Sequence, residues 1–93
     1  MSVVVVLPAP LRELAGGEAS VPLAGYPGTV GEALAALRTE HAAVYDRIVT
    51  EQGEVRQHVN LFVGTTSVRR TGGLDTPLEP DSEILVLPSV SGG

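Results

Sequence analysis

The 93-residue sequence contains no cysteine. A chain without cysteine has no disulfide framework, no thiolate metal site and no nucleophilic thiol of its own. Any sulfur chemistry in which it takes part must therefore use sulfur supplied from outside. The only histidines are His41 and His58, and neither has a second histidine or a carboxylate at metal-ligand spacing. We therefore expect no metal site.

Lysine is also absent, and all six basic residues are arginines. A composition bias that favours arginine would explain this, but the absence has a chemical consequence in any case. If the carboxyl terminus were made electrophilic, the chain would offer no lysine amine to attack it. The formal net charge is −5. Because nucleic acids and anionic membranes are bound through basic surfaces, this charge argues against both as partners.

No long apolar run suggests a membrane span or a secretory signal. The longest run near the N-terminus, Val3–Leu7, has five residues, with no basic stretch before it and no small-residue cleavage pattern after it. The composition, 43% hydrophobic and 18% charged, is that of a globular protein with room for one core. We expect a cytoplasmic protein with one domain, residues 1–88, and a flexible C-terminal tail, residues 89–93.

The clearest local pattern is the stretch TVGEALAALRTEH, which begins at Thr29. Thr29 is a natural N-cap, and Glu32 three residues later completes a capping box. Apolar side chains then recur at helical spacing, so one face of this helix should be buried. Residues 42–49 either continue the helix or restart as a short second one.

Short apolar segments predict strands on both sides of this helix. They cover residues 2–7, 18–23, 58–63, 67–70 and 83–87, and residues 8–17 form a loop with a helical turn. Pro22 places the second strand at a sheet edge, and Pro88 should end the pairing of the last one. The order of elements matches the α+β class and the β-grasp, or ubiquitin-like, arrangement. This fold is a mixed sheet with one main crossing helix, and its first and last strands lie parallel at the centre.

The first and last predicted strands are apolar on both faces. Val3 and Val5 point to one face of the sheet, and Val4 and Val6 to the other. Uniform apolarity is typical of strands that are covered on both sides. Because one helix covers one face of the sheet, something else must cover the apolar side chains on the second face. The candidates are loop residues, residues 42–49 and another protein. An exposed apolar patch usually marks a partner site.

No set of side chains in the sequence forms a recognisable active site. Glu79, Asp81 and Glu83 cluster at a turn, where acidic side chains are ordinarily solvated. Arg69-Arg70 could dock an acidic partner but is more simply a solvated pair. No serine has a histidine and an acid in a known catalytic motif. We therefore expect no catalytic residue, no bound cofactor and no enzyme activity.

Glycine pairs occur three times, and the last pair ends the sequence. Gly16-Gly17 and Gly72-Gly73 lie in loops, where glycine supplies positive φ angles. Gly92-Gly93 follows the last strand and has no turn to make. A terminal Gly-Gly alone is a weak signal, because frayed ends and cloning scars also produce it. It gains weight directly after the final strand of a β-grasp domain.

Further motifs accompany this ending. The segment from Val59 to Gly93 contains VN-φ-φ-V, VR, GGL, an acidic turn and LP-x-V-x-GG, and PAPLRELAGG occupies Pro8–Gly17. With these motifs the chain resembles the ubiquitin-like sulfur carriers of the ThiS/MoaD family, and most of all the CysO-type carriers that deliver sulfur for cysteine synthesis. Ser91, where such tails often carry alanine, departs from the pattern without an obvious chemical consequence.

The resemblance implies that Gly93 is the sulfur-carrying residue. A ubiquitin-activating-type enzyme adenylates its carboxylate with ATP, and sulfide or a persulfide displaces AMP to leave a thiocarboxylate. Glycine admits the chain to a narrow channel because it has no Cβ. The residues expected to give the tail access to the partner's active site are Val90, Ser91 and Gly92. The residues expected to dock the partner are Leu87 and Pro88.

The resemblance also implies the partners, which are the activating and sulfur-transferring enzyme, a sulfur-accepting biosynthetic enzyme and a metal-dependent peptidase that regenerates the tail. Cysteine formation is the first choice of pathway, ahead of molybdopterin, a thiolated natural product, thiazole and tRNA. The long segment Thr39–Gln57 argues against a thiazole-type carrier. Two other functions stay open: a protein modifier conjugated to target lysines through Gly93, and a β-grasp binding module without carrier activity.

Overall fold

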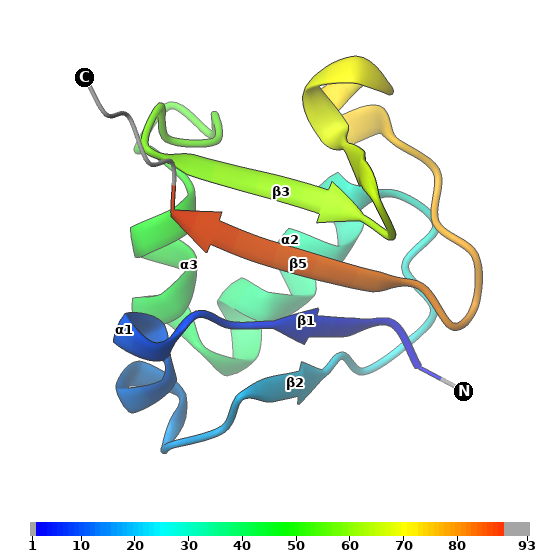
Figure 1. Cartoon of the computed structure of the whole chain (residues 1–93). Coiled ribbons are helices and arrows are strands. Elements are labelled where there is room, and N and C mark those ends of the chain that lie inside the picture. Colours follow the sequence, from blue (N-terminus) through cyan, green and yellow to red (C-terminus); the bar gives the residue numbers. More distant parts are fainter. Residues whose placement is uncertain (1, 89–93) are drawn as a thin grey trace.

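The computed structural model describes residues 2–88 and shows a five-stranded sheet with helices packed behind it (Figure 1). The strands are β1 (Val4–Val6), β2 (Ser20–Pro22), β3 (Val59–Val63), β4 (Thr66–Ser67) and β5 (Glu83–Pro88). The helices are α1 (Ala9–Arg12), α2 (Val30–Glu40) and α3 (Ala42–Ile48). Single 3₁₀ turns occur at η1 (Glu13–Ala15), η2 (Val68–Arg70) and η3 (Gly73–Asp75).

The strand order is β2-β1-β5-β3-β4, which confirms the predicted β-grasp topology. The first and last strands, β1 and β5, run parallel at the centre, with Val5 opposite Ile84. The other neighbouring strands pair antiparallel. Strand β2, which contains Pro22, lies at one edge as predicted, where a proline leaves no central ladder bond unmade.

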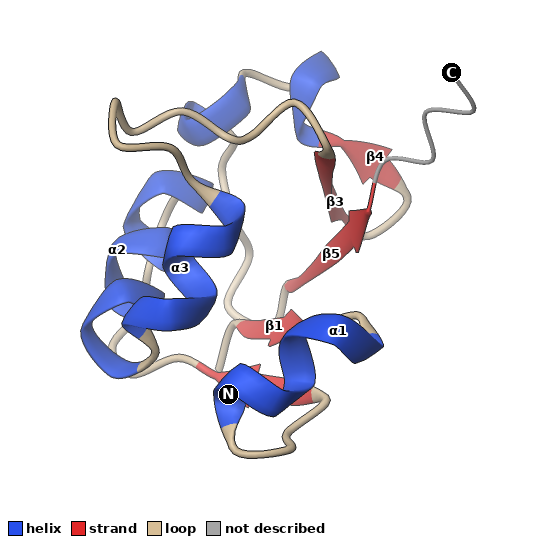
Figure 2. Ribbon diagram, turned by 90° about the vertical axis from the view of Figure 1, so that its left-hand side faces the viewer, coloured by secondary structure: helices blue, strands red, loops and turns tan. Residues whose placement is uncertain are grey.

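The hydrophobic core lies between the sheet and the two longer helices, which share one side of it (Figure 2). Alternate residues of the central strands point into this core because side chains alternate along a strand. The buried residues in or directly next to the three central strands are Val3, Val5, Leu7, Leu61, Ile84 and Val86. The helices present side chains at helical spacing, namely Val30, Ala33, Leu34, Leu37, Val44 and Ile48. The predicted buried face of α2 is therefore confirmed.

Substitutions at two adjacent residues of β5 test which face of the sheet the helices cover. Ile84 is 0% exposed in the core, whereas Leu85 is half-buried on the opposite face. We expect Ile84→Ala to lower the free energy of unfolding by about 2–5 kcal/mol, because it opens a core cavity. Leu85→Ala, the matched control, should cost roughly 1 kcal/mol, because less surface is buried there. Urea unfolding measures both, and equal losses would contradict this assignment of the two faces.

Helix α2 begins at the predicted N-cap. The Thr29 hydroxyl accepts a hydrogen bond from the Glu32 amide at 3.2 Å. The Glu32 carboxylate accepts from the Gly28 amide at 2.7 Å rather than from Thr29, so the capping box is displaced by one residue. A bridge between Thr29 and Pro77 fixes the chain at this point. Helix α2 ends before His41, whose φ of −141° separates it from α3, so residues 42–49 restart as a second helix.

Two predictions about the later strands are wrong. Only Thr66 and Ser67 pair with β3, and the expected strand over 67–70 turns into η2, where the Ser67 hydroxyl accepts from the Arg69 amide at 3.3 Å. Pro88 does not leave the sheet but lies opposite Val59 as the last described residue of β5, so the strand is one residue longer than predicted. Because β1 pairs with β5 no further than Leu85, this end of β5 has a neighbour on one side only, where proline is tolerated.

Candidate functional site at the end of the last strand

The face of the sheet opposite the helices is uncovered within residues 2–88, so of the expected covers only another protein stays a prediction. Figure 1 looks onto this face, and both α2 and α3 lie behind the sheet. We call its apolar residues the open face. They are Val4, Val6, Phe62 and Leu85, which are half-buried, and Leu87, which is 43% exposed. Residues 42–49, one of the three candidates expected to cover this face of the sheet, are thereby ruled out.

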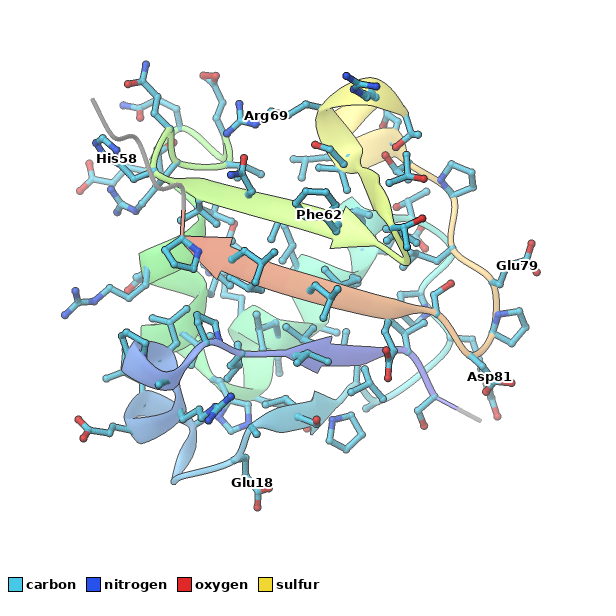
Figure 3. All side chains as sticks on the ribbon, in the orientation of Figure 1. Glu18, His58, Phe62, Arg69, Glu79 and Asp81 are labelled. Carbon is cyan, nitrogen blue, oxygen red and sulfur yellow. The ribbon has the colours of Figure 1, made fainter. Side chains whose placement is uncertain are left out.

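The apolar side chains of the open face adjoin one another across the three central strands. Val6 of β1 lies opposite Leu85 of β5, which in turn lies opposite Phe62 of β3. Figure 3 shows Phe62 on this face. Directly opposed Cβ atoms in a sheet lie about 4.5–5.5 Å apart, so these three side chains can form one continuous row. Leu87 extends the open face along β5 towards the end of the strand.

The structure describes the predicted site residues only as far as Pro88. Leu87 and Pro88 are exposed at the end of β5, where a partner can reach them. Val90, Ser91, Gly92 and Gly93 lie outside the described residues, so their roles stay predictions. The strand itself fixes where the tail begins, because the β3 and β1 ladders hold β5 on both sides up to Leu85 and on one side up to Pro88.

A groove of about 200 Å³ adjoins this end of β5, and we call it the root groove. Its lining is Pro8, Pro10, Leu11, Arg47, His58, Val59, Val86, Leu87 and Pro88. These residues come from α1 and the residue before it, from α3, from the start of β3 and from β5. No sequence pattern predicts that Arg47 and His58 line the same groove, because the packing of α3 behind the sheet brings them together.

Arg69 braces the start of β3, next to the root groove. Its guanidinium donates to the Val59 carbonyl at 3.0 Å and to the Arg56 carbonyl at 3.4 Å. Arg56 in turn donates to the Asp46 carbonyl of α3 at 2.9 Å. Arg69 is therefore more than a solvated charge, because it holds the strand segment that pairs with Pro88. In Figure 3, His58 and Arg69 lie towards this end of the sheet.

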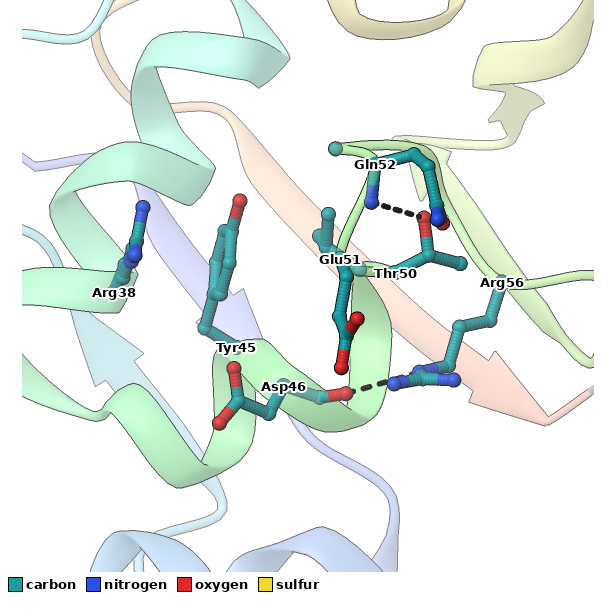
Figure 4. A pocket seen from close by; sticks show the side chains of 9 residues that line it. Arg38, Tyr45, Asp46, Thr50, Glu51, Gln52 and Arg56 are labelled. Atoms are coloured by element: carbon teal, nitrogen blue, oxygen red, sulfur yellow. Dashed lines mark hydrogen bonds between the residues drawn. The ribbon is translucent and has the colours of Figure 1, made fainter.

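A second, larger hollow of about 550 Å³ shares no lining residue with the root groove. Figure 4 shows its polar wall, where Arg56 binds the Asp46 carbonyl and the Thr50 hydroxyl accepts from the Gln52 amide at 3.3 Å. Arginines and carboxylates both line it, and the Arg38 guanidinium lies 5.5 Å from the centre of the Tyr45 ring. Because its lining carries charges of both signs, the hollow does not indicate one class of ligand.

The acidic turn at the other end of the sheet has a structural explanation. The Ser82 hydroxyl accepts from the Glu79 amide at 2.8 Å, and the Ser82 amide donates to the Glu79 carbonyl at 3.1 Å. Glu79, Asp81 and Glu83 are all exposed. In the part of the chain that the structure describes, no three histidine or acidic side chains could hold a metal ion. No helix in that part is long and apolar enough to cross a membrane.

A ubiquitin-like β-grasp domain is defined by this combination of parallel central strands, helices on one face and an accessible end of the last strand. Residues 5–93 match the ThiS family, and the chain belongs to this family. It is 32% identical to sulfur carrier protein CysO of Mycobacterium tuberculosis over the full length of both chains. It is also 35% identical to small archaeal modifier protein 3 of Haloferax volcanii, over 70% of each chain.

Solved structures agree with this assignment. The crystal structure of the Amycolatopsis orientalis BexX/CysO complex contains a chain that matches with a TM-score of 0.86 and 34% identity, covering 99% of this chain and 100% of that one. The crystal structure of SAMP1 from Haloferax volcanii matches with a TM-score of 0.79 and 31% identity over all of both chains. The fold and the resemblance predicted from the sequence are thus confirmed.

Proposed function

We propose that this protein is a sulfur carrier whose Gly93 carboxylate is converted to a thiocarboxylate. The observation that carries the proposal is the similarity to a sulfur carrier over the full length of both chains, at 32% identity. The geometry of residues 2–88 supports it, because β5 is held in the centre of the sheet and ends at an accessible position, directly before the last five residues of the sequence.

The proposed chemistry uses the terminal carboxylate as its only reacting group. An oxygen of the carboxylate attacks the α-phosphorus of ATP in the activating enzyme, and pyrophosphate leaves. Hydrosulfide then attacks the carbonyl carbon of the acyl-adenylate, AMP leaves, and loss of the proton gives the ionised thiocarboxylate. When a persulfide supplies the sulfur, a second thiol must cleave the resulting acyl disulfide. Each step belongs to a partner enzyme, so the carrier needs no active site.

The domain contributes binding and position. Docking of the folded body on a partner makes the reaction of the tail effectively intramolecular, which can lower the barrier by several kcal/mol, about 7 or more in favourable cases. The open face supplies an apolar docking surface that leads directly to Leu87 and Pro88. A CysO chain forms a complex with BexX in Amycolatopsis orientalis, which supports a partner enzyme for this chain.

We propose cysteine synthesis as the first destination of the sulfur, because the full-length relatives are CysO proteins. Molybdopterin and thiolated natural products are the next candidates. The accepting enzyme selects the pathway, since the same thiocarboxylate serves each of them. A cytoplasmic location fits a reaction that consumes ATP, and a metal-dependent peptidase that trims the product back to Gly93 would return the carrier to use.

Intact-mass measurement tests the carrier function. The chain is incubated with ATP, its activating enzyme and sulfide, and we expect a mass gain equal to the replacement of one oxygen by sulfur. Fragmentation should place the gain at Gly93. A reaction without ATP is the control and should give no gain. No gain with any activating enzyme from the same cell would contradict the proposal.

A second candidate function is protein modification, which the similarity to archaeal modifier proteins favours. Gly93 would then form an isopeptide bond with a lysine of a target protein. Because this chain has no lysine, it cannot extend such a conjugate through a lysine of its own. Mass spectrometry of cell extract would reveal lysines linked to Gly93, whereas thiocarboxylate without such links favours the carrier.

A further inference from the structure

The root groove differs in charge from the protein as a whole. The chain has eleven acidic side chains and a formal net charge of −5. The groove contains the cationic side chain of Arg47 and the imidazole of His58, and none of its lining residues is acidic. The remaining lining is apolar, from leucine, valine and proline side chains. An occupant of this groove should therefore combine an apolar side chain with a carboxylate.

The volume and stiffness of the groove indicate what kind of molecule fits. At about 200 Å³ it is smaller than pockets for small molecules, which usually have about 300–1,000 Å³. A side chain from another protein is a better match than a metabolite. Three prolines, Pro8, Pro10 and Pro88, form part of the walls. Their restricted backbone reduces the entropy lost when a partner is bound.

The position of the groove connects it with the tail. Pro88 is both a wall of the groove and the last residue of β5, so only residues 89–93 separate the groove from Gly93. An enzyme that encloses those five residues must bring the mouth of its channel close to the groove. Leu87 belongs to the groove and also to the open face, so the two surfaces are continuous.

We propose that the root groove binds a segment of the activating enzyme at the mouth of its tail channel, and that this segment pairs an aspartate or glutamate with an apolar side chain. Arg47 binds the carboxylate, and Leu11, Val59 and Leu87 receive the apolar group. This inference rests on the proposed carrier function. Electrostatic complementarity of this kind raises the association rate and fixes the orientation of docking.

Arg47→Glu tests the inference, with Arg38→Glu as its matched control. Both arginines lie in the last turn of a helix, but only Arg47 lines the root groove. ATP–pyrophosphate exchange by the activating enzyme measures the KM for the carrier and kcat. We expect Arg47→Glu to raise KM about 10-fold with kcat nearly unchanged, because a rim charge acts on docking and not on the chemistry. Arg38→Glu should stay within about 2-fold of wild type on both.

A conservative variant and a series of salt concentrations test whether the change in KM comes from the charge of Arg47. Arg47→Lys keeps the positive charge and should restore KM to within about 3-fold of wild type. Raising the salt concentration should increase the wild-type KM but lower that of Arg47→Glu, because salt screens an attraction in the first and a repulsion in the second. Equal KM values for Arg47→Glu and Arg38→Glu would overturn the inference. If the wild-type chain is not adenylated at all, the proposed function fails, and that outcome is distinct from a failure of the groove.

Discussion

Gly93→Val should reduce thiocarboxylate formation by about 100-fold or more, because a branched side chain at the reacting residue would displace its carboxylate in a narrow channel. Misplacing a reacting group by about 1 Å is enough for a loss of that size. The rate of the mass gain at saturating ATP and sulfide measures the effect. The free energy of unfolding should be unchanged, because the sheet and its core lie within residues 2–88.

Ser91→Ala is the matched control for this variant. It changes the same tail two residues earlier and introduces a side chain that related tails often carry, so we expect a rate within about 2-fold of wild type. Normal thiocarboxylate formation by Gly93→Val would show that the channel argument is wrong. Loss of activity in both variants would instead show that Ser91 takes part in recognition.

The sequence was sufficient to predict the topology because the signals for it are local. The N-cap at Thr29, the helical spacing of apolar residues and the edge proline Pro22 each occur within a few neighbouring positions. The sequence does not decide between one continuous helix and a break at His41, since no proline or glycine marks the break. The structure selects the break.

The wrong predictions concern features that depend on distant contacts. Residues 42–49 were one expected cover for the second face, but burial depends on where the helices pack, and α2 and α3 both lie on the same side of the sheet. Pro88 stays in the sheet because of its neighbours in space and not because of its own chemistry. The root groove likewise joins Pro8, Arg47 and His58, which are far apart in the sequence.

Phe62→Asp should weaken docking on the activating enzyme, since it puts a charge at the centre of the open face. Removing a central aromatic contact from an interface typically costs 2 kcal/mol or more, so we expect the KM for the carrier to rise by about 30-fold. The value of kcat at saturating carrier should be nearly unchanged, because Phe62 pairs with Leu85 in the folded domain, whereas the reacting carboxylate is at Gly93, five residues beyond the end of β5.

Thr66→Asp is the control, because it adds the same charge to the neighbouring strand at a different face. Thr66 is exposed and lies opposite Val63, whereas Ser67 lies opposite Phe62. Both substitutions introduce a poor strand former at a cost of about 1 kcal/mol. Phe62→Asp also loses the partial burial of the Phe62 side chain, so urea unfolding of both variants must show that each stays folded under the assay conditions. An unchanged KM for Phe62→Asp would mean that the open face is not the docking surface. A raised KM for Phe62→Asp alone would explain why so small a domain leaves Val6, Phe62 and Leu85 without a cover of its own: the cover is the partner enzyme.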